Sequence, residues 1–183
     1  HQSPGNHTVV TQQPTSDWRD EQWVLGYGLY VNSLIHMYLK LFGEDEKAQT
    51  VAELMEGKFK IPGKPYYALW TYKNFKSTRF DLLGNSLAIL SGAIPEDRAV
   101  KILDWVEGKC EKLRERGDLA IDLPPVLLPF IGPKDPEWRP RYEEYNQPGE
   151  YHNGGIWPFV VSFYVTAAEA SGQKVLARDK LNT

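Results

Sequence analysis

Residues 29–42, LYVNSLIHMYLKLF, carry apolar side chains around most of the circumference of a helix. This pattern predicts a helix that is buried on nearly all sides, which we call an inner helix. After a break at Gly43, residues 44–56 have apolar residues at i, i+3, i+4 and i+7, namely Ala48, Val51, Ala52 and Met55. The second pattern predicts an outer helix with one apolar face and one charged face.

The same alternation occurs further along the chain. Residues 80–91 and 156–170 are apolar with few charges, and they predict two more inner helices. Residues 95–116 open with Pro-Glu-Asp, a favourable first helical turn, and carry one apolar stripe. Residues 173–180 begin another charged helix. Because repeated hairpins with alternating burial are typical of repeat architectures, we predict an all-α ring of helical hairpins, with an irregular helical bundle as the alternative.

Three segments do not fit the helical pattern. Residues 66–72 are β-prone and predict a short strand or an extended loop. Residues 121–149 are rich in proline and aromatic residues and predict a long ordered excursion. Residues 1–16 lack the apolar core of a secretory signal, and we interpret them as a disordered or extended N-terminal segment.

Composition excludes several classes of protein. The 183 residues, 42% of them hydrophobic, are enough for one domain with a sizeable core. The 21 basic and 24 acidic residues form neither a basic stripe nor an acidic block, so we expect no nucleic-acid partner and no membrane partner. The single cysteine, Cys110, cannot form an internal disulfide, which predicts a reducing, cytoplasmic location. Four histidines without close spacing argue against a metal site.

Polar residues gather before each predicted inner helix. The three groups are Asp17-Trp-Arg-Asp20 through Tyr27 before the first helix, Arg79 and Asp81 at the start of the second, and Glu150 to Asn153 before the third. If the inner helices run parallel, all three groups open at one end of the ring, where helix dipoles are positive and backbone N–H groups are free. We therefore predict that they line one pocket.

The mixture of groups suits a neutral ligand that is rich in hydroxyl groups. Carboxylates and amides can bind hydroxyl groups, and indole rings can pack against the apolar C–H faces of a sugar. The sharper hypothesis is therefore a sugar site. Simpler interpretations stay open for single residues: Asp17 as a capping residue, His152 as a buried histidine, Gly154-Gly155 as a turn, and Arg79 paired with Asp81.

Three segments resemble one family of enzymes in the same order along the chain. Residues 151–158, YHNGGIWP, are similar to the "SYHNGGSWP" segment of the alkaline/neutral invertases, glycoside hydrolase family 100. Residues 80–90, FDLLGNSLAIL, resemble the family's "F-x-L-G-N-x-x-A-I-L" segment, and residues 17–30 resemble an earlier stretch with an acid and a Gly-Tyr-Gly turn. Bacterial hydrolases of the debranching or α-glucosidase kind share parts of the first motif.

The resemblance implies an (α/α)6 toroid that hydrolyses an α-glucosidic bond, as in sucrose, with no metal and no organic cofactor. An inverting pair of carboxylic acids, about 6.5–9.5 Å apart, would protonate the leaving oxygen and activate water. The catalytic candidates are Asp17, Asp20 and Glu150. The candidate substrate-binding residues are Trp18, Tyr27, Arg79, Asp81, Asn85, Tyr151, His152, Asn153 and Trp157.

The chain departs from the family in its catalytic pair. The family's general acid lies before the region matched by Asp17, and its general base lies after the region matched by Arg178. By a looser analogy with other toroidal glucosidases, Asp17 or Asp20 is the acid; Glu150 is the remaining carboxylate nearest the pocket, although the motif does not mark it as the base. Residues 17–183 are thus expected to form a partial toroid that self-associates or binds a missing second half.

Two alternatives to hydrolysis follow. A partial toroid without a complete acid/base pair would be a sugar-binding or structural protein. An epimerase on the same kind of toroid would need histidines as proton carriers, and only His152 is placed for that role.

Overall fold

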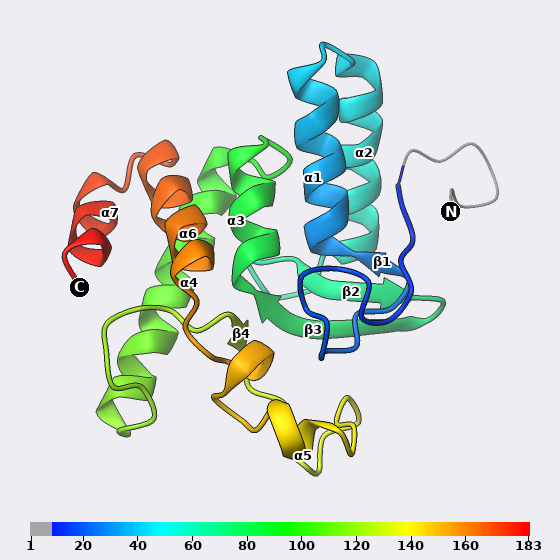
Figure 1. Cartoon of the computed structure of the whole chain (residues 1–183). Coiled ribbons are helices and arrows are strands. Elements are labelled where there is room, and N and C mark those ends of the chain that lie inside the picture. Colours follow the sequence, from blue (N-terminus) through cyan, green and yellow to red (C-terminus); the bar gives the residue numbers. More distant parts are fainter. Residues whose placement is uncertain (1–8) are drawn as a thin grey trace.

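The computed structural model describes residues 9–183 (Figure 1). Of the predicted N-terminal segment 1–16, residues 1–8 lie outside the described residues. The rest of that segment is extended and joined to the fold. Gln12 pairs with Gly26 through two backbone hydrogen bonds of 2.6 and 3.1 Å. The amide side chain of Asn32 in the first helix binds both the backbone N–H and the backbone C=O of Val10.

Three helices stand side by side and run in the same direction, with α3 in the middle (Figure 1): α1 (Leu29–Leu41), α3 (Leu82–Leu90) and α6 (Pro158–Ala170). Each is followed by a helix that runs back: α2 (Asp45–Phe59), α4 (Glu96–Glu115) and α7 (Lys174–Leu181). The six helices confirm the predicted positions of three helical hairpins. The complete toroid stays a prediction.

A small antiparallel sheet lies below the starts of α1 and α3 (Figure 1). Its strands pair in the order β1 (Tyr27–Gly28), β2 (Ala68–Tyr72), β3 (Phe75–Asp81) and β4 (Leu127–Leu128). The predicted all-α class is therefore corrected to mostly helical with a four-stranded sheet. The β-prone stretch is a strand, as expected, but Phe80 was wrongly assigned to the second inner helix. Phe80 pairs with Ala68 and Leu128 in the sheet, and the helix begins at Leu82.

The excursion at 121–149 is ordered. It contributes β4 to the sheet, and it contains the short helix α5 (Tyr142–Tyr145). The phenol of Tyr142 is 1% exposed, and its oxygen accepts a hydrogen bond of 2.9 Å from the backbone N–H of Trp23. The excursion is therefore packed against the N-terminal part of the chain.

Burial confirms α3 as an inner helix but corrects the expectation for α1 and α6, each of which has an exposed side. Every residue from Leu82 to Ala88 is buried, and Gly84 allows close packing, because a Cβ atom there would lie 3.1 Å from Cγ of Leu29. On α1, in contrast, Leu34, Tyr38 and Leu41 are 38%, 58% and 79% exposed. The reason is that α1 packs against α2 and α3 on one side, whereas its other side has no helix against it within the described residues. On α6, Phe159 and Phe163 are 43% and 39% exposed.

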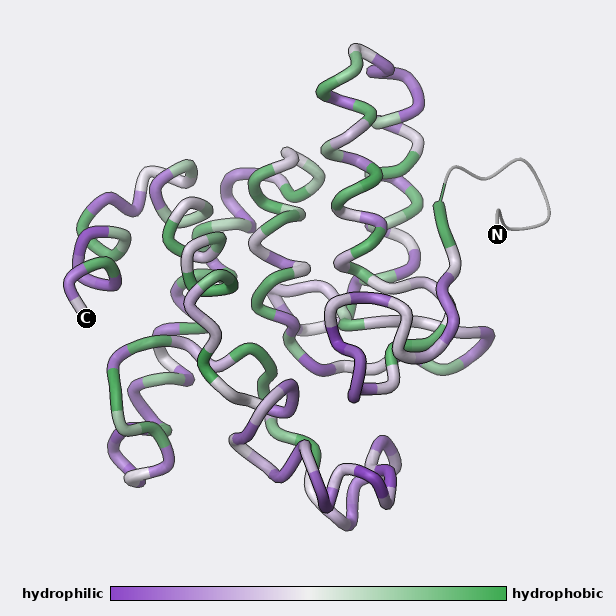
Figure 2. Tube along the Cα trace, in the orientation of Figure 1, coloured by the Kyte–Doolittle hydropathy of each residue, from purple (hydrophilic) through white to green (hydrophobic). Residues whose placement is uncertain are grey.

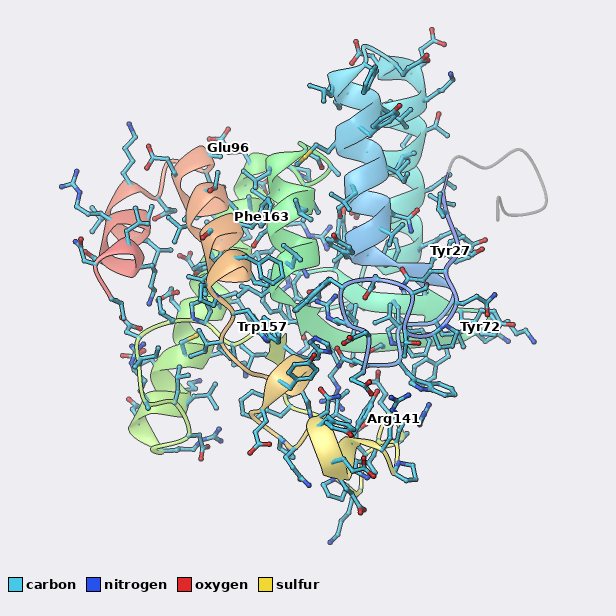
Figure 3. All side chains as sticks on the ribbon, in the orientation of Figure 1. Tyr27, Tyr72, Glu96, Arg141, Trp157 and Phe163 are labelled. Atoms are coloured by element: carbon cyan, nitrogen blue, oxygen red, sulfur yellow. The ribbon has the colours of Figure 1, made fainter. Side chains whose placement is uncertain are left out.

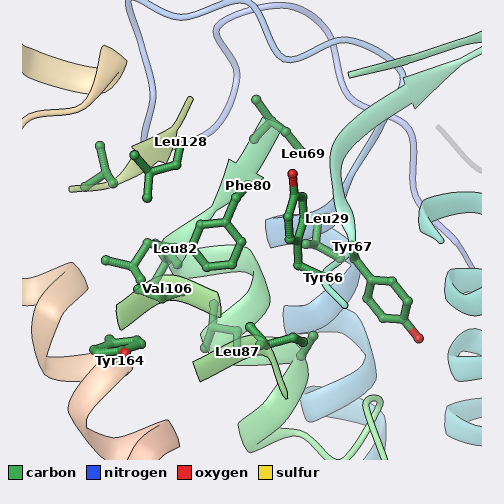
Figure 4. Close-up of a cluster of buried hydrophobic side chains, with 14 of the residues drawn as sticks. Leu29, Tyr66, Tyr67, Leu69, Phe80, Leu82, Leu87, Val106, Leu128 and Tyr164 are labelled. Carbon is green, nitrogen blue, oxygen red and sulfur yellow. The ribbon is translucent and has the colours of Figure 1, made fainter. Parts of the chain in front are cut away.

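The core lies where the inner helices meet α4 and the sheet. Figure 2 shows α3 as largely hydrophobic, α7 as a mixture of both kinds, and the loops around α5 as largely hydrophilic. Side chains from five elements meet in one cluster (Figure 4): Phe80 of β3, Leu82 and Leu87 of α3, Val106 of α4, Leu128 of β4 and Tyr164 of α6. This cluster fixes the ends of the inner helices relative to the sheet, and the candidate site lies at those ends.

Candidate functional site

Aromatic side chains from two distant segments meet just before α6. Trp18 makes edge-to-face contacts with His152, Trp157 and Phe159, with ring centroids 5.0, 5.7 and 5.2 Å apart. His152 is stacked on Trp157 at 5.6 Å. Figure 3 shows Trp157 below the start of α6. We call these four residues the aromatic cluster. It joins the first and third polar groups predicted from the sequence.

The turn that carries His152 is held by two buried asparagines. Asn153 accepts a hydrogen bond from the backbone N–H of Ile131 at 2.6 Å and donates to the carbonyl oxygens of Ile131 and Asn146 at 2.7 and 2.9 Å. Asn146 in turn accepts one from the backbone N–H of His152 at 3.0 Å. Gly154 ends the turn with φ +119°, and a Cβ atom there would collide with the Phe130 ring. Asn153 and Gly154 thus shape the loop, as the simple turn interpretation proposed.

The three candidate catalytic carboxylates have different surroundings. Asp20 is 69% exposed and lies 3.9 Å from Nε2 of His152 and 3.4 Å from the hydroxyl of Tyr151. Asp17 accepts hydrogen bonds from the backbone N–H of Arg19 at 2.8 Å and from the side-chain amide of Gln12 at 2.9 Å. Glu150 is exposed, and its carboxylate forms no hydrogen bond or ion pair within residues 9–183. Of these three carboxylates, Asp20 is therefore the one that approaches a residue of the aromatic cluster, His152.

Asp81 connects the second polar group to this cluster through Arg19. The two side chains form an ion pair, and both are 0% exposed. The guanidinium of Arg19 also lies 4.5 Å from the centroid of the Trp18 ring. Burial raises the pKa of Asp81, and the positive charge of Arg19 opposes that rise. The pair therefore ties Trp18 to the residue directly before α3.

Arg79 and Asp81 do not pair with each other. Arg79 forms ion pairs with Asp135 and Glu137 and donates hydrogen bonds to the carbonyl oxygens of Pro129 and Phe130. The same strand thus sends Arg79 and Asp81 to different clusters. Arg79 holds the excursion against β3, away from the aromatic cluster.

Two further predicted residues lie apart from the aromatic cluster. Asn85 is 0% exposed and binds the backbone N–H and C=O of Tyr67, at 2.9 and 3.2 Å, and the carbonyl of Asp81 at 2.9 Å. Tyr27 lies on β1 with the Lys58 ammonium 4.2 Å from its ring centroid, and Figure 3 shows it well away from Trp157. In this conformation neither side chain faces Trp18.

Several buried polar atoms of residues 18–22 and of His152 have no hydrogen-bond partner within the described residues. They are Nε1 of Trp18, Nε and Nη1 of Arg19, both side-chain polar atoms of Gln22, and Nδ1 of His152. Buried polar groups are normally satisfied by protein, water or a ligand. Arg19, Gln22 and Phe159 were not singled out from the sequence, although Arg19 and Gln22 lie within the first polar group and Phe159 directly follows the quoted motif.

Burial and the nearby Arg19 charge lower the pKa of His152 to about 4, against the smaller opposing effects of Asp20 and Asp17. The imidazole is therefore neutral at pH 7, with one ring nitrogen as donor and the other as acceptor. A neutral histidine beside exposed Asp20 and Tyr151 can bind hydroxyl groups, but it is not a cation at neutral pH.

The sequence profile of one family, described as alkaline and neutral invertase, matches residues 71–183, well over half of the chain. The chain belongs to this family. The match contains the YHNGGIWP motif and the whole FDLLGNSLAIL segment, so the invertase-family part supplies His152, Trp157 and Asp81 to the site. Asp17, Trp18 and Asp20 lie before the matched region.

Individual invertases are similar over about half of the chain. Probable alkaline/neutral invertase F of Arabidopsis thaliana is 28% identical over 106 residues, which are 55% of this chain and 19% of that protein. Cytosolic invertase 1 of Oryza sativa subsp. japonica is 30% identical over 106 residues, 55% of this chain and 17% of that protein. Neutral/alkaline invertase 1, mitochondrial, of the same rice is 32% identical over 102 residues, 55% and 15% of the two chains. The matched region thus spans less than a fifth of these relatives.

The relatives carry cytosolic, mitochondrial and chloroplastic names. Membership of the invertase family therefore assigns no compartment, and the cytoplasmic location stays a prediction. Residues 9–183 include no helix that is long and apolar enough to cross a membrane. The same residues contain no group of three or more His, Cys, Asp or Glu side chains that could hold a metal ion.

Proposed function

We propose that the chain provides a sugar-binding wall of an inverting glycoside hydrolase that acts on sucrose or a related small α-glucoside. The observation that carries the proposal is the meeting of Trp18, His152, Trp157 and Phe159 with the Asp20 carboxylate. Membership of the alkaline and neutral invertase family supports it. In the complete enzyme, the three hairpins would be part of an (α/α)6 toroid.

The chemistry of the wall fits a carbohydrate. Indole and phenyl rings offer flat apolar surfaces for the C–H faces of a sugar ring. The Asp20 carboxylate and the Tyr151 hydroxyl, which lie 3.4 Å apart, offer polar groups for its hydroxyl groups. Neutral His152 offers a donor and an acceptor. The unpaired amide of Gln22 and the indole N–H of Trp18 are further groups that a hydroxyl group or a bridging water could satisfy.

Among the carboxylates, we propose Asp20 as the general acid. Asp17 already accepts two local hydrogen bonds, and Asp81 is closed off from solvent by its pairing with Arg19. A bound sugar would cover the exposed Asp20 carboxylate, and burial against apolar groups favours the protonated form that an acid needs. The base would lie about 6.5–9.5 Å from the acid, across the sugar. We propose that residues outside this chain supply it.

The second candidate function is sugar binding without hydrolysis. Its supporting observation is the isolation of Glu150, whose carboxylate contacts none of the aromatic cluster. In that case the chain would bind a sugar but would have one carboxylate at most in a position to react.

Reducing-sugar release from sucrose and maltose distinguishes the two functions. We expect slow or no release by residues 1–183, and clear release by the longer reading frame that contains them. Asp20→Asn should lower that release by about 10²–10⁴-fold, the usual contribution of one proton-transfer group. The control Asp97→Asn changes an aspartate on α4 whose side chain is similarly exposed, at 75% against 69% for Asp20, and should leave the rate unchanged.

A titration followed by tryptophan fluorescence reports binding separately from turnover. Sucrose should change the emission of the 183-residue chain, and Trp18→Phe should reduce that change. Rapid sucrose hydrolysis by a monomer of this chain, abolished by Glu150→Gln, would show that the base lies within it. Absence of both binding and turnover in the longer protein would refute a sugar site.

A further inference from the structure

A pocket whose lining differs in chemistry from the aromatic cluster lies between α4, β4 and the loop before β2. Its volume is about 300 Å³. Aromatic rings of Tyr66, Trp105 and Phe130 line it. Its basic lining residues are Lys64, Lys109, Lys112 and Arg116. We propose that this pocket binds a small phosphate monoester whose organic part is a ring, with the phosphate on the basic side chains and the ring on the aromatic ones.

The pocket is assembled from three separate parts of the chain. Trp105, Lys109, Lys112 and Arg116 follow one another at intervals of four, three and four residues, so they share one face of α4. Lys64 comes from the loop before β2, and Phe130 comes from the segment after β4. No basic stripe is visible in the sequence, because acidic residues alternate with these lysines along the chain. The helix places the acids on its other faces.

The aromatic side of the pocket is fixed by packing. The rings of Tyr66 and Trp105 lie 4.4 Å apart, and Phe80 lies 5.3 and 5.2 Å from them. Tyr66 is 2% exposed, and its hydroxyl donates a hydrogen bond of 3.1 Å to the carbonyl of Thr78. A surface of this kind offers a rigid flat face to a ring, with little loss of side-chain entropy on binding.

The charges on the basic side are largely uncompensated. Lys64 and Lys112 form no ion pair within the described residues, and Lys109 contacts only the Trp105 ring, at 5.5 Å from its centroid. Arg116 pairs with Asp118 at 3.0 Å, but both side chains are more than half exposed, so the pair is weak. Among residues 9–183, no acidic residue lines the pocket. Like charges brought together repel one another, and a dianion between them would relieve that repulsion.

The residues that line the pocket also argue against other kinds of ligand. A neutral sugar needs hydrogen-bond acceptors, and the pocket lining offers no carboxylate or amide side chain for this purpose. A purely apolar ligand would leave the three lysine charges without an ion-pair partner. The volume, at the lower end of the range for small-molecule sites, fits one ring with one phosphate.

The pocket is separate from the aromatic cluster but adjoins the loop that carries His152. Phe130 lines the pocket, and its ring also lies against Gly154, where it leaves no room for a Cβ atom. Binding of a phosphate ester to the pocket can be tested independently of the proposed sugar wall, because this binding requires no hydrolysis of a sugar.

Isothermal titration calorimetry at low salt tests the proposal with four probes: glucose 6-phosphate, phenyl phosphate, inorganic phosphate and glucose. We expect at least one ester to bind about 10-fold more tightly than inorganic phosphate, and glucose to give no heat from this pocket. Which ester binds more tightly shows whether the ring is a sugar or an aromatic group. Equal affinity for both esters and inorganic phosphate would overturn the proposal, because the aromatic side would then contribute nothing.

Two variants locate the binding. The double variant Lys109→Gln/Lys112→Gln should weaken ester binding by about 10-fold or more, since each charged hydrogen bond contributes about that factor. Lys40→Gln/Lys47→Gln makes the same change of net charge at exposed positions on α1 and α2, away from the pocket, and should leave the affinity within twofold. Equal losses in both double variants would show non-specific attraction and overturn the proposal. All four positions are exposed, so neither variant should unfold the chain.

Discussion

Arg19→Met removes the partner of a carboxylate that has no access to water. Arg19 and Asp81 are both 0% exposed and form an ion pair across 62 residues of sequence. Breaking a buried ion pair by removing one partner costs about 3–5 kcal/mol, because the remaining charge stays buried. Loss of the contact between the guanidinium and Trp18 adds about 0.5–1 kcal/mol. Since domains are stable by only about 5–15 kcal/mol, the variant should lose roughly a quarter or more of its free energy of unfolding.

The loss should depend on pH in a defined direction. Burial already raises the pKa of Asp81, and without Arg19 that pKa should rise further. An acid whose folded-state pKa lies above its unfolded value loses stability as the pH rises from the unfolded to the folded pKa. The cost of Arg19→Met should therefore be smaller at pH 5 than at pH 8. The double variant Arg19→Met/Asp81→Asn should recover part of the loss at pH 8.

Urea unfolding, followed by circular dichroism at both pH values, measures these differences. A loss below about 1 kcal/mol for Arg19→Met, with no dependence on pH, would refute the reasoning. So would a double variant whose loss equals the sum of the two single losses, because the pair would then have no coupling energy.

Three more changes are predicted. Between pH 7 and pH 5 the free energy of unfolding should fall by about 2 kcal/mol on account of His152, because its pKa is lowered to about 4 in the folded state and only the unfolded state takes up a proton there. His152→Gln should remove this part of the fall, as measured by urea unfolding. Gly154→Ala should cost about 2–4 kcal/mol, through its positive φ and a collision with Phe130, whereas Gly172→Ala, with φ +77° and open space, should cost about 1 kcal/mol. Leu41→Glu should reduce self-association through the exposed face of α1, measured by light scattering.

Each of these has a clear contrary outcome. An unchanged pH slope for His152→Gln would mean that the imidazole is protonated in the folded state at pH 5. Equal costs for the two glycine variants would show that the Phe130 contact contributes nothing. A chain that is monomeric at high concentration before any substitution would contradict self-association through α1.

The succession of helices could be read from the sequence because each helix has a periodic apolar pattern of its own. Strands β1 and β4 could not, since two residues carry no periodicity and exist only through pairing with β2 and β3. Phe80 was misassigned for a related reason: one buried apolar residue fits the end of a strand and the start of a helix equally well. The exposure of Leu41 depends on which neighbours α1 has, and no local pattern contains that information.

The candidate site was predicted in part for the same kind of reason. The meeting of Trp18 with His152 and Trp157 followed from their shared position before parallel inner helices. The roles of Arg19 and Arg79 depended on partners 62 and 56 residues away, and local sequence does not specify such partners. A buried arginine is rarely expected from composition, because charged side chains are seldom buried without a partner.

Arg19 has two roles that a final substitution can separate. Its charge compensates Asp81, and its planar group lies over Trp18 at 4.5 Å. Lysine keeps the charge but has no planar group to stack on an indole. Arg19→Lys should therefore lose less stability than Arg19→Met, yet shift the NMR signal of the Trp18 indole N–H as much as Arg19→Met does. Arg79→Lys, at an ion pair remote from Trp18, should leave that signal in place. An unshifted Trp18 signal in Arg19→Lys would mean that His152, Trp157 and Phe159 alone position the ring, and that the buried ion pair supports the fold without shaping the site.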